Sequence, residues 1–120
     1  MDEQREEYFK NLAKEFQNLV YEEKLYTNSQ LSLDIMAGYL NASRYNVSYA
    51  INKYLGKNFH AFINELRIKE ALQIIQDPDR PYKTVKEIAQ TVGFNDRSSF
   101  YRVCKRITGV NPLELEDLCR

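Results

Sequence analysis

The sequence has few of the features that mark membrane, secreted or metal-binding proteins. No apolar run approaches the roughly 20 residues that span a bilayer, and the first ten residues, MDEQREEYFK, are too acidic and polar for a signal peptide. The two cysteines, Cys104 and Cys119, lack the spacing of metal ligands. We therefore expect a cytoplasmic protein with reduced cysteines, with Cys104 in the core, and with no metal, no cofactor and no contact with a membrane.

The residues of an enzyme active site are scarce as well. The single histidine, His60, has no cysteine, serine or carboxylate at a recognisable catalytic spacing, and the chain has no glycine-rich phosphate loop. His60 is expected at the surface, and the sequence predicts a protein that is not an enzyme. With four glycines, three prolines and 43% hydrophobic residues, the composition is that of an ordinary globular protein. A length of 120 residues predicts one domain, or two very small ones that share a helix.

The chain as a whole has no excess of basic charge, because 17 basic residues balance 17 acidic ones. Neutrality argues against strong nonspecific binding to nucleic acid. The charges are unevenly distributed, however. Residues 1–34 hold four basic and eight acidic side chains, residues 35–110 hold twelve and six, and residues 111–120 hold one and three. A basic centre between acidic ends would orient the protein on a polyanion and limit nonspecific binding.

Residues 84–109 have the pattern of a helix-turn-helix. Thr84 and Glu87 have capping-box spacing, and Asp96 can cap a second helix after a break that begins at Gly93. Each helix has an apolar stripe at helical spacing, formed by Val85, Ile88, Ala89 and Val92 and then by Phe100, Val103, Cys104 and Ile107. The opposite face of the second helix carries Arg97, Ser98, Tyr101, Arg102 and Lys105. These side chains could reach base edges and phosphates in a major groove.

Residues 31–57 repeat this pattern. The offset between matching positions is 52 residues before the turn and 53 after it, which a one-residue insertion in the second turn explains. Ser32 and Ser43 stand at the cap positions. The apolar stripes consist of Leu33, Met36, Ala37 and Leu40 and then of Val47, Ala50, Ile51 and Tyr54. The outer face carries Arg44, Tyr45, Asn46, Ser48, Tyr49, Asn52 and Lys53. Such side chains suit bases and phosphates, with a polar face of no function as the open alternative.

We therefore predict an all-α protein of about seven helices, in which two helix-turn-helix subdomains are joined by a long spacer helix. The predicted segments are an N-terminal packing helix and loop over 1–30, the first helix-turn-helix over 31–57, the spacer over 58–77, the second helix-turn-helix over 78–110 and a C-terminal helix over 111–120. The 18 residues of the spacer from Phe59 to Gln76, about 27 Å long at 1.5 Å per residue, could hold two recognition helices near the roughly 34 Å of one DNA turn.

Two further expectations concern the packing of these helices. The N-terminal stripe of Tyr8, Phe9, Leu12, Ala13, Phe16, Leu19 and Val20 is expected to pack in the core. A coiled coil is the alternative, but the stripe is shorter than the three to four heptads that would favour one. Arg67, in the middle of the spacer, is expected to tie it to a neighbouring unit and not to contact DNA.

Residues 31–115 resemble the DNA-binding domain of the AraC/XylS family of bacterial transcription regulators. The most specific positions are Ile88-Ala89, Gly93-Phe94, Ser99-Phe100, Lys105, Thr108-Gly109 and Pro112. The segment NELRIKEA over 64–71 is similar to versions common in Bacteroidetes, where the domain often ends a longer sensor protein. Two positions depart from the family pattern: Cys104 replaces an aromatic residue, and Leu115-Glu116 replaces an aromatic-arginine pair.

The resemblance implies sequence-specific binding of promoter double-stranded DNA by both recognition helices. It also implies transcription activation through RNA polymerase, by the output domain of a longer sensor protein. The chain is expected to be monomeric and the full-length protein dimeric. Base reading is implied for Tyr45, Asn46, Ser48 and Tyr49 in the first unit and for Arg97, Ser98, Ser99 and Arg102 in the second. Phosphate contacts are implied for Arg44, Lys53, Lys105 and Arg106.

The alternative function is that of a helix-turn-helix module that binds protein and not DNA. A protein-binding face would tolerate acidic or bulky apolar side chains. Residues 97–106 hold four basic and no acidic side chains, which favours DNA.

Overall fold

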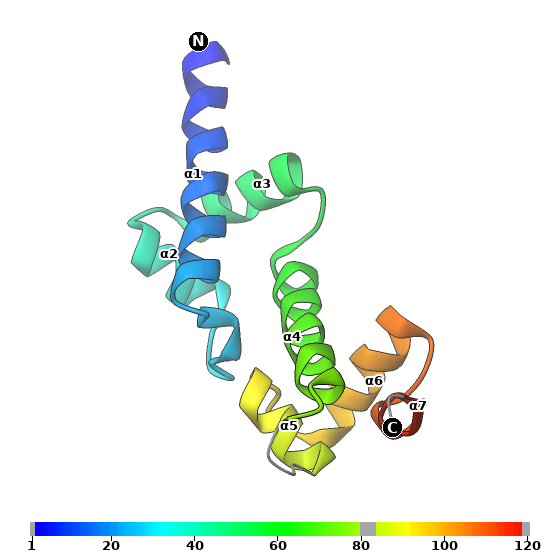
Figure 1. Ribbon diagram of the computed structural model, residues 1–120. Helices are drawn as coiled ribbons and strands as arrows, with labels where there is room; N and C mark the ends of the chain where they lie inside the picture. The colour runs from blue at the N-terminus through cyan, green and yellow to red at the C-terminus, as the bar shows by residue number, and fades with distance from the viewer. Residues whose placement is uncertain (1, 80–83, 119–120) are drawn as a thin grey trace. The chain divides into compact units, whose positions relative to one another are not determined.

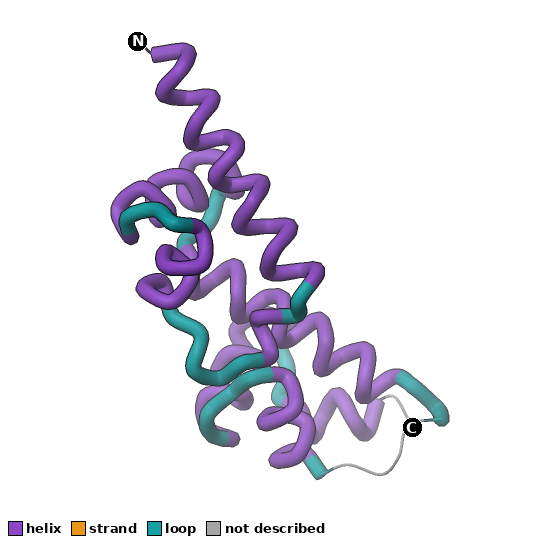
Figure 2. The backbone as a smooth tube through the Cα atoms, turned by 90° about the vertical axis from the view of Figure 1, so that its left-hand side faces the viewer, coloured by secondary structure: helices purple, strands orange, loops and turns teal. Residues whose placement is uncertain are grey.

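The computed structural model describes residues 2–79 and 84–118, and these residues form only helices and loops (Figures 1 and 2). The helices are α1 (Asp2–Glu22), the 3-10 turn η1 (Leu25–Thr27), α2 (Leu33–Leu40), α3 (Arg44–Leu55), α4 (Phe59–Gln76), α5 (Val85–Val92), α6 (Arg97–Thr108) and α7 (Pro112–Leu118). The predicted all-α class is confirmed. Cys119, the predicted loop residues Arg80 and Pro81, and the side chain of Glu116 lie outside the described residues.

The helices begin at side chains that accept hydrogen bonds from otherwise unpaired backbone N–H groups. The four predicted caps of the two helix-turn-helix units are all present: the side-chain oxygens of Ser32, Ser43, Thr84 and Asp96 each accept from the N–H three residues further on. Asn58 and Asn111 cap α4 and α7 in the same way, at 2.8 and 2.9 Å. The chain therefore fixes where six of its helices start by local side-chain chemistry.

The turns of the two helix-turn-helix units differ at their first residue. Asn41 is the C-cap residue of α2, and Gly93 is that of α5. Both residues have left-handed backbone, with φ of 52° and 111°. A Cβ on Gly93 would lie 2.5 Å from the carbonyl oxygen of Tyr26 and 2.8 Å from Nε of Arg67. Only glycine satisfies both the backbone angle and the space at this position.

The chain forms two compact units. Unit 1 comprises residues 1–25 and 30–62, so α1 belongs to it together with α2 and α3. Core packing of α1, rather than a coiled coil, is confirmed: Phe9, Leu12, Ala13, Phe16 and Val20 are buried. The expectation for Tyr8 is wrong, because this ring stands at the edge of the stripe and is 46% exposed.

Unit 2 comprises residues 26–29 and 63–120. Its core is a single cluster to which α4, α5 and α6 contribute, formed by Ile68, Ala71, Ile75, Val85, Ile88, Ala89, Val92, Phe94, Phe100, Val103 and Cys104. The burial of Cys104 is confirmed, and burial raises the pKa of its thiol. His60 is exposed, as expected. None of the described helices combines the length and the apolar character needed to cross a bilayer.

Arg67 acts within unit 2 as predicted, as a tie and not as a surface cation. Its guanidinium donates to the carbonyl oxygens of Tyr26 at 2.6 Å and of Asn28 at 3.1 Å. The same group lies over the ring of Phe94, 5.6 Å from its centroid. Arg67 thereby joins the segment before α2 to the turn of the second helix-turn-helix.

Candidate nucleic-acid interface

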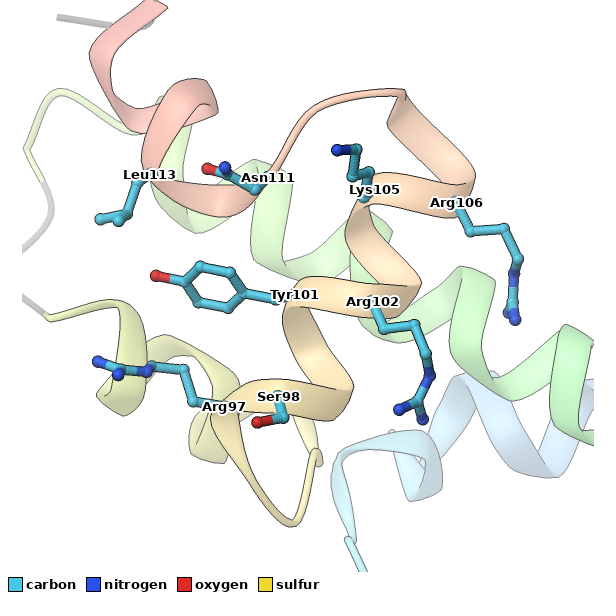
Figure 3. A pocket seen from close by; sticks show the side chains of 8 residues that line it. All are labelled: Arg97, Ser98, Tyr101, Arg102, Lys105, Arg106, Asn111 and Leu113. Atoms are coloured by element: carbon cyan, nitrogen blue, oxygen red, sulfur yellow. The ribbon is translucent and has the colours of Figure 1, made fainter.

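The outer face of α6 forms one wall of a groove of about 840 Å³ (Figure 3). Six of its lining residues lie on α6, one caps α7 and one lies in the first turn of α7. The lining residues are Arg97, Ser98, Tyr101, Arg102, Lys105, Arg106, Asn111 and Leu113. Four of the eight are cations and none is acidic, so this surface suits a polyanion.

α6 is held in place at both ends and along its inner face. At its start the carboxylate of Asp96 accepts a 2.7 Å hydrogen bond from the N–H of Ser99. Hydrogen bonds from the backbone and the hydroxyl of Ser99, and the nearby charge of Arg102, lower the pKa of Asp96. Phe100 is completely buried, and Gly109 ends the helix in left-handed backbone. The outer face is thus presented by a rigid helix.

The cations of the groove point in several directions. Arg97 lies over the ring of Tyr101, 5.8 Å from its centroid. In Figure 3 the side chains of Arg102 and Arg106 extend to one side of α6, and those of Tyr101 and Leu113 extend to the other. Within the described part of the chain, no ion pair to an acidic side chain engages these cations. They remain available to phosphates and base edges.

The structure brings three of the four predicted base-reading residues of the second unit into the groove. Arg97, Ser98 and Arg102 line it, as do the predicted phosphate contacts Lys105 and Arg106. Ser99 is half-buried and does not line the groove, because its N–H and its hydroxyl both bond to Asp96. Its predicted role in base reading stays a prediction.

Three lining residues were not among the predicted contacts. Tyr101 had a signal, since it lies on the polar stripe of the recognition helix. Asn111 and Leu113 had none, because their place in the groove depends on the packing of α7 against α6. Leu113 is 51% exposed. Lys86 is another cation without a predicted role; it lines a smaller hollow beside Asn95 and Arg97.

On α3, the recognition helix of the first unit, several predicted DNA contacts already bond to side chains of α1 and α2. Tyr45 is 68% exposed, and Asn46 and Ser48 are half-buried. Arg44, a predicted phosphate contact, forms an ion pair with Asp34 of α2 at 3.2 Å. The free surface of α3 therefore centres on Tyr45.

The other two predicted contacts of α3, Tyr49 and Lys53, lie against α1. The ring of Tyr49 packs on Phe9 with the centroids 4.5 Å apart. The carboxylate of Glu6 accepts from Lys53 at 2.7 Å and from the hydroxyl of Tyr49 at 3.3 Å. These bonds, with one from Tyr54, lower the pKa of Glu6 to about 2 and raise the pKa of Lys53.

Comparison with known proteins bears on what these two helix-turn-helix units do. A family profile described as "Helix-turn-helix domain" matches residues 36–117, more than half of the chain. The chain belongs to the AraC-type helix-turn-helix family of DNA-binding domains. This AraC-type domain is 33% identical over 82 residues to the transcriptional regulator MtrA of Neisseria gonorrhoeae. It is 32% identical over 89 residues to an uncharacterized HTH-type transcriptional regulator of Staphylococcus aureus strain COL.

The match to MtrA covers 68% of this chain and 26% of MtrA. The match to the S. aureus regulator covers 74% of this chain and 12% of that regulator. Solved structures share the fold. The C-terminal domain of the response regulator AraT from Geobacillus stearothermophilus superposes with a TM-score of 0.79 at 24% identity, over 89% of this chain and 84% of that one. The DNA-binding domain of AdpA, in complex with a target DNA, gives 0.76 at 17%, over 88% and 90%.

Proposed function

We propose that this AraC-type domain recognises a specific double-stranded DNA sequence by inserting α6 and α3 into successive major grooves. The observation that carries the proposal is the groove along α6, whose lining includes four cations and no acidic side chain. The AdpA domain, which shares the fold, was solved with a target DNA. A helix that is capped, buried on one face and cationic on the other is suited to insertion into a major groove.

On α6 the two arginines nearest its start are proposed as base readers. Arginine can donate two parallel hydrogen bonds to O6 and N7 of guanine, which gives sequence discrimination. Arg97 and Arg102 line the groove together with Ser98, which can donate to or accept from a base edge. Lys105 and Arg106, one turn further along, are proposed to neutralise phosphates.

On α3 the proposed base readers are Tyr45, Asn46, Ser48 and Tyr49. Asparagine can pair with adenine through two hydrogen bonds, and a tyrosine can pack on a thymine methyl or donate to a phosphate. Arg44 and Lys53 are proposed as phosphate contacts. Because Arg44 is paired with Asp34 and Lys53 with Glu6, each must exchange a carboxylate for a phosphate on binding.

At the level of the whole protein, we propose a cytoplasmic transcription regulator in which this domain is the output module. The match to this chain spans only 26% of MtrA and 12% of the S. aureus regulator, which supports the proposal that the domain belongs to a longer protein. The proposal includes activation of transcription through RNA polymerase, a monomeric domain and a dimeric full-length protein.

Selection of binding sites from a random duplex library by the 120-residue chain tests the proposed function. The expected result is a motif of two parts about 10 base pairs apart, one for each recognition helix. A single short motif would indicate that only one recognition helix reads bases, and that α3 does not contribute to recognition. No enrichment above the starting library, combined with capture of a protein partner, would replace DNA binding by the alternative of a protein-interaction module.

A further inference from the structure

One carboxylate of α1 accepts hydrogen bonds from three polar side chains of the first recognition helix. Glu6 accepts hydrogen bonds from Lys53 Nζ at 2.7 Å, from the Tyr49 hydroxyl at 3.3 Å and from the Tyr54 hydroxyl. All three donors belong to α3, and all four residues belong to unit 1.

Two of these donors lie on the outer face of α3. Tyr45, Tyr49 and Lys53 follow one another at four-residue intervals, so they form one stripe along the helix. The inner face is set by Val47, Ala50 and Ile51, which are completely buried. Tyr45, at the start of the stripe, is 68% exposed, whereas Tyr49 is half-buried beneath α1.

The neighbours of Glu6 strengthen this cover. Arg5 lies over the ring of Tyr49, 5.5 Å from its centroid, and over that of Phe9 at 5.1 Å. Lys53 also donates to the Tyr49 hydroxyl at 3.2 Å. The first two turns of α1 therefore close over the second half of the stripe and leave the first half open.

The chemistry of this contact matches that of a phosphate contact. An ammonium and phenolic hydroxyls are groups that bind DNA phosphates, and a carboxylate offers them the same kind of anionic oxygen. We propose that Glu6 stands in for a DNA phosphate on α3, so that the N-terminal helix competes with DNA for Lys53 and Tyr49. This inference rests on the proposed function, because it requires α3 to face DNA.

The inference has a measurable consequence for affinity. Each lysine that neutralises a phosphate steepens the dependence of binding on salt by about 0.9 in a log–log plot. With Glu6 in place, Lys53 gains little when it exchanges one anion for another. Without that carboxylate, Lys53 would add a full phosphate contact.

Removal of the Glu6 charge should leave the fold intact. The attachment of α1 to unit 1 depends on buried Phe9, Leu12 and Phe16, and exposed ion pairs contribute little to stability. Glu6→Gln keeps the size of the side chain and abolishes the charge. Glu7→Gln is the matched control, because Glu7 is exposed and makes no hydrogen bond or ion pair within the described residues.

The test measures binding of the full chain to a fluorescein-labelled duplex that carries the selected motif, by anisotropy at NaCl concentrations from about 50 to 200 mM. For Glu6→Gln we expect binding about two- to fivefold tighter at the lowest salt, and a salt dependence steeper by about 0.9. Glu7→Gln should leave the steepness unchanged. Lys53→Gln should remove the gain when it is combined with Glu6→Gln.

Several outcomes would overturn the inference. Weaker binding by Glu6→Gln, with an unchanged helical circular-dichroism signal, would make Glu6 a residue that positions α3 for DNA. Equal effects of Glu6→Gln and Glu7→Gln would reduce the effect to net charge. If Tyr45→Ala leaves affinity for the duplex unchanged, α3 does not face DNA. Failure of the unaltered chain to bind any selected duplex would instead reject the proposed function itself.

Discussion

The guanidinium of Arg67 donates a 2.6 Å hydrogen bond from Nε to the carbonyl oxygen of Tyr26. A second bond, 3.1 Å long, reaches the carbonyl of Asn28, and the plane of the group lies over the ring of Phe94. The hydroxyl of Tyr26 in turn donates to Glu70 at 2.8 Å. Two adjacent turns of α4 thus hold the short segment that precedes α2 against the turn of the second helix-turn-helix.

Replacement of Arg67 by methionine should destabilise the protein by about 2 kcal/mol, because two carbonyl oxygens lose a charged donor. Arg67→Lys should recover only part of this loss, since an ammonium lacks the planar fork that reaches both carbonyls and covers the ring. Urea unfolding followed by circular dichroism measures the effect. Lys69→Met, an exposed change on the same helix, is the control, and an equal loss there would contradict the role of Arg67.

Gly93→Ala should be among the most damaging small substitutions, at about 3 kcal/mol or more. The added Cβ would meet the Tyr26 carbonyl oxygen at 2.5 Å, on a backbone with φ of +111°. Substitutions at two other glycines distinguish the cost of the backbone angle from the cost of the steric clash. Gly109→Ala, at φ of +87° in open space, should cost about 1–2 kcal/mol. Gly38→Ala, inside α2 and also in open space, should stabilise by about 0.5–1 kcal/mol. Equal losses at Gly93 and Gly109 would show that space does not matter.

Arg97→Ala and Arg102→Ala should each weaken binding to the selected duplex by about 1–3 kcal/mol and should weaken binding to random DNA less. Lys105→Ala and Arg106→Ala should weaken binding to both duplexes alike and lower the salt dependence by about 0.9 each. Anisotropy titrations on the two duplexes distinguish the classes. Equal losses on both duplexes for an arginine variant would make that arginine a phosphate contact.

Leu113→Ala should weaken specific DNA binding by roughly 1 kcal/mol without loss of stability. Leu113 lines the groove and is 51% exposed, so it can pack on a thymine methyl or a sugar and has little folding contact to lose. Ile107→Ala is the control, because Ile107 is an exposed aliphatic residue of α6, 40% exposed, that does not line the groove. A fall in Tm that matches the fall in affinity would assign Leu113 a structural role.

Acidification should remove the contribution of the Glu6 carboxylate to the contact between α1 and α3. The pKa of Glu6 is lowered from 4.5 to about 2 by Lys53, Tyr54 and Tyr49. The stability that this carboxylate contributes is therefore fully present above pH 4.5 and is lost as the pH falls towards 2. The difference in Tm between the unaltered chain and Glu6→Gln should shrink over that interval. The difference from Glu7→Gln should stay flat, and a parallel decline there would show a general effect of carboxylate protonation.

The order of helices and the inner face of each could be predicted because the signals are local. Ser32, Ser43, Thr84 and Asp96 cap helices through atoms three residues apart, and the apolar stripes need only helical spacing. One helix-turn-helix pattern is weak evidence by itself. Its repetition at offsets of 52 and 53 residues makes the prediction of two helix-turn-helix units strong. The predictions for Tyr8 and Ile107, which are 46% and 40% exposed, are wrong because the edge of a stripe has the same spacing whether or not a neighbour covers it.

Contacts between distant segments could not be predicted in the same way. Glu6 and Lys53 are 47 residues apart, and each belongs to a face that looks solvated when its own helix is considered alone. Leu113 enters the groove only because α7 packs against α6. The residue types of α3 and α6 indicate a DNA-binding surface, but the contact of α3 with α1 depends on the folded structure of unit 1.

The segment Tyr26–Ser29 belongs to unit 2, although the residues on both sides of it belong to unit 1. The second half of the domain is therefore discontinuous in sequence. A chimera that exchanged only the residues from 63 onward with those of a relative would keep a foreign Tyr26 segment against Arg67, Glu70 and Gly93. Exchange of DNA specificity between members of this family is therefore expected to succeed when residues 26–29 are exchanged together with the residues from 63 onward.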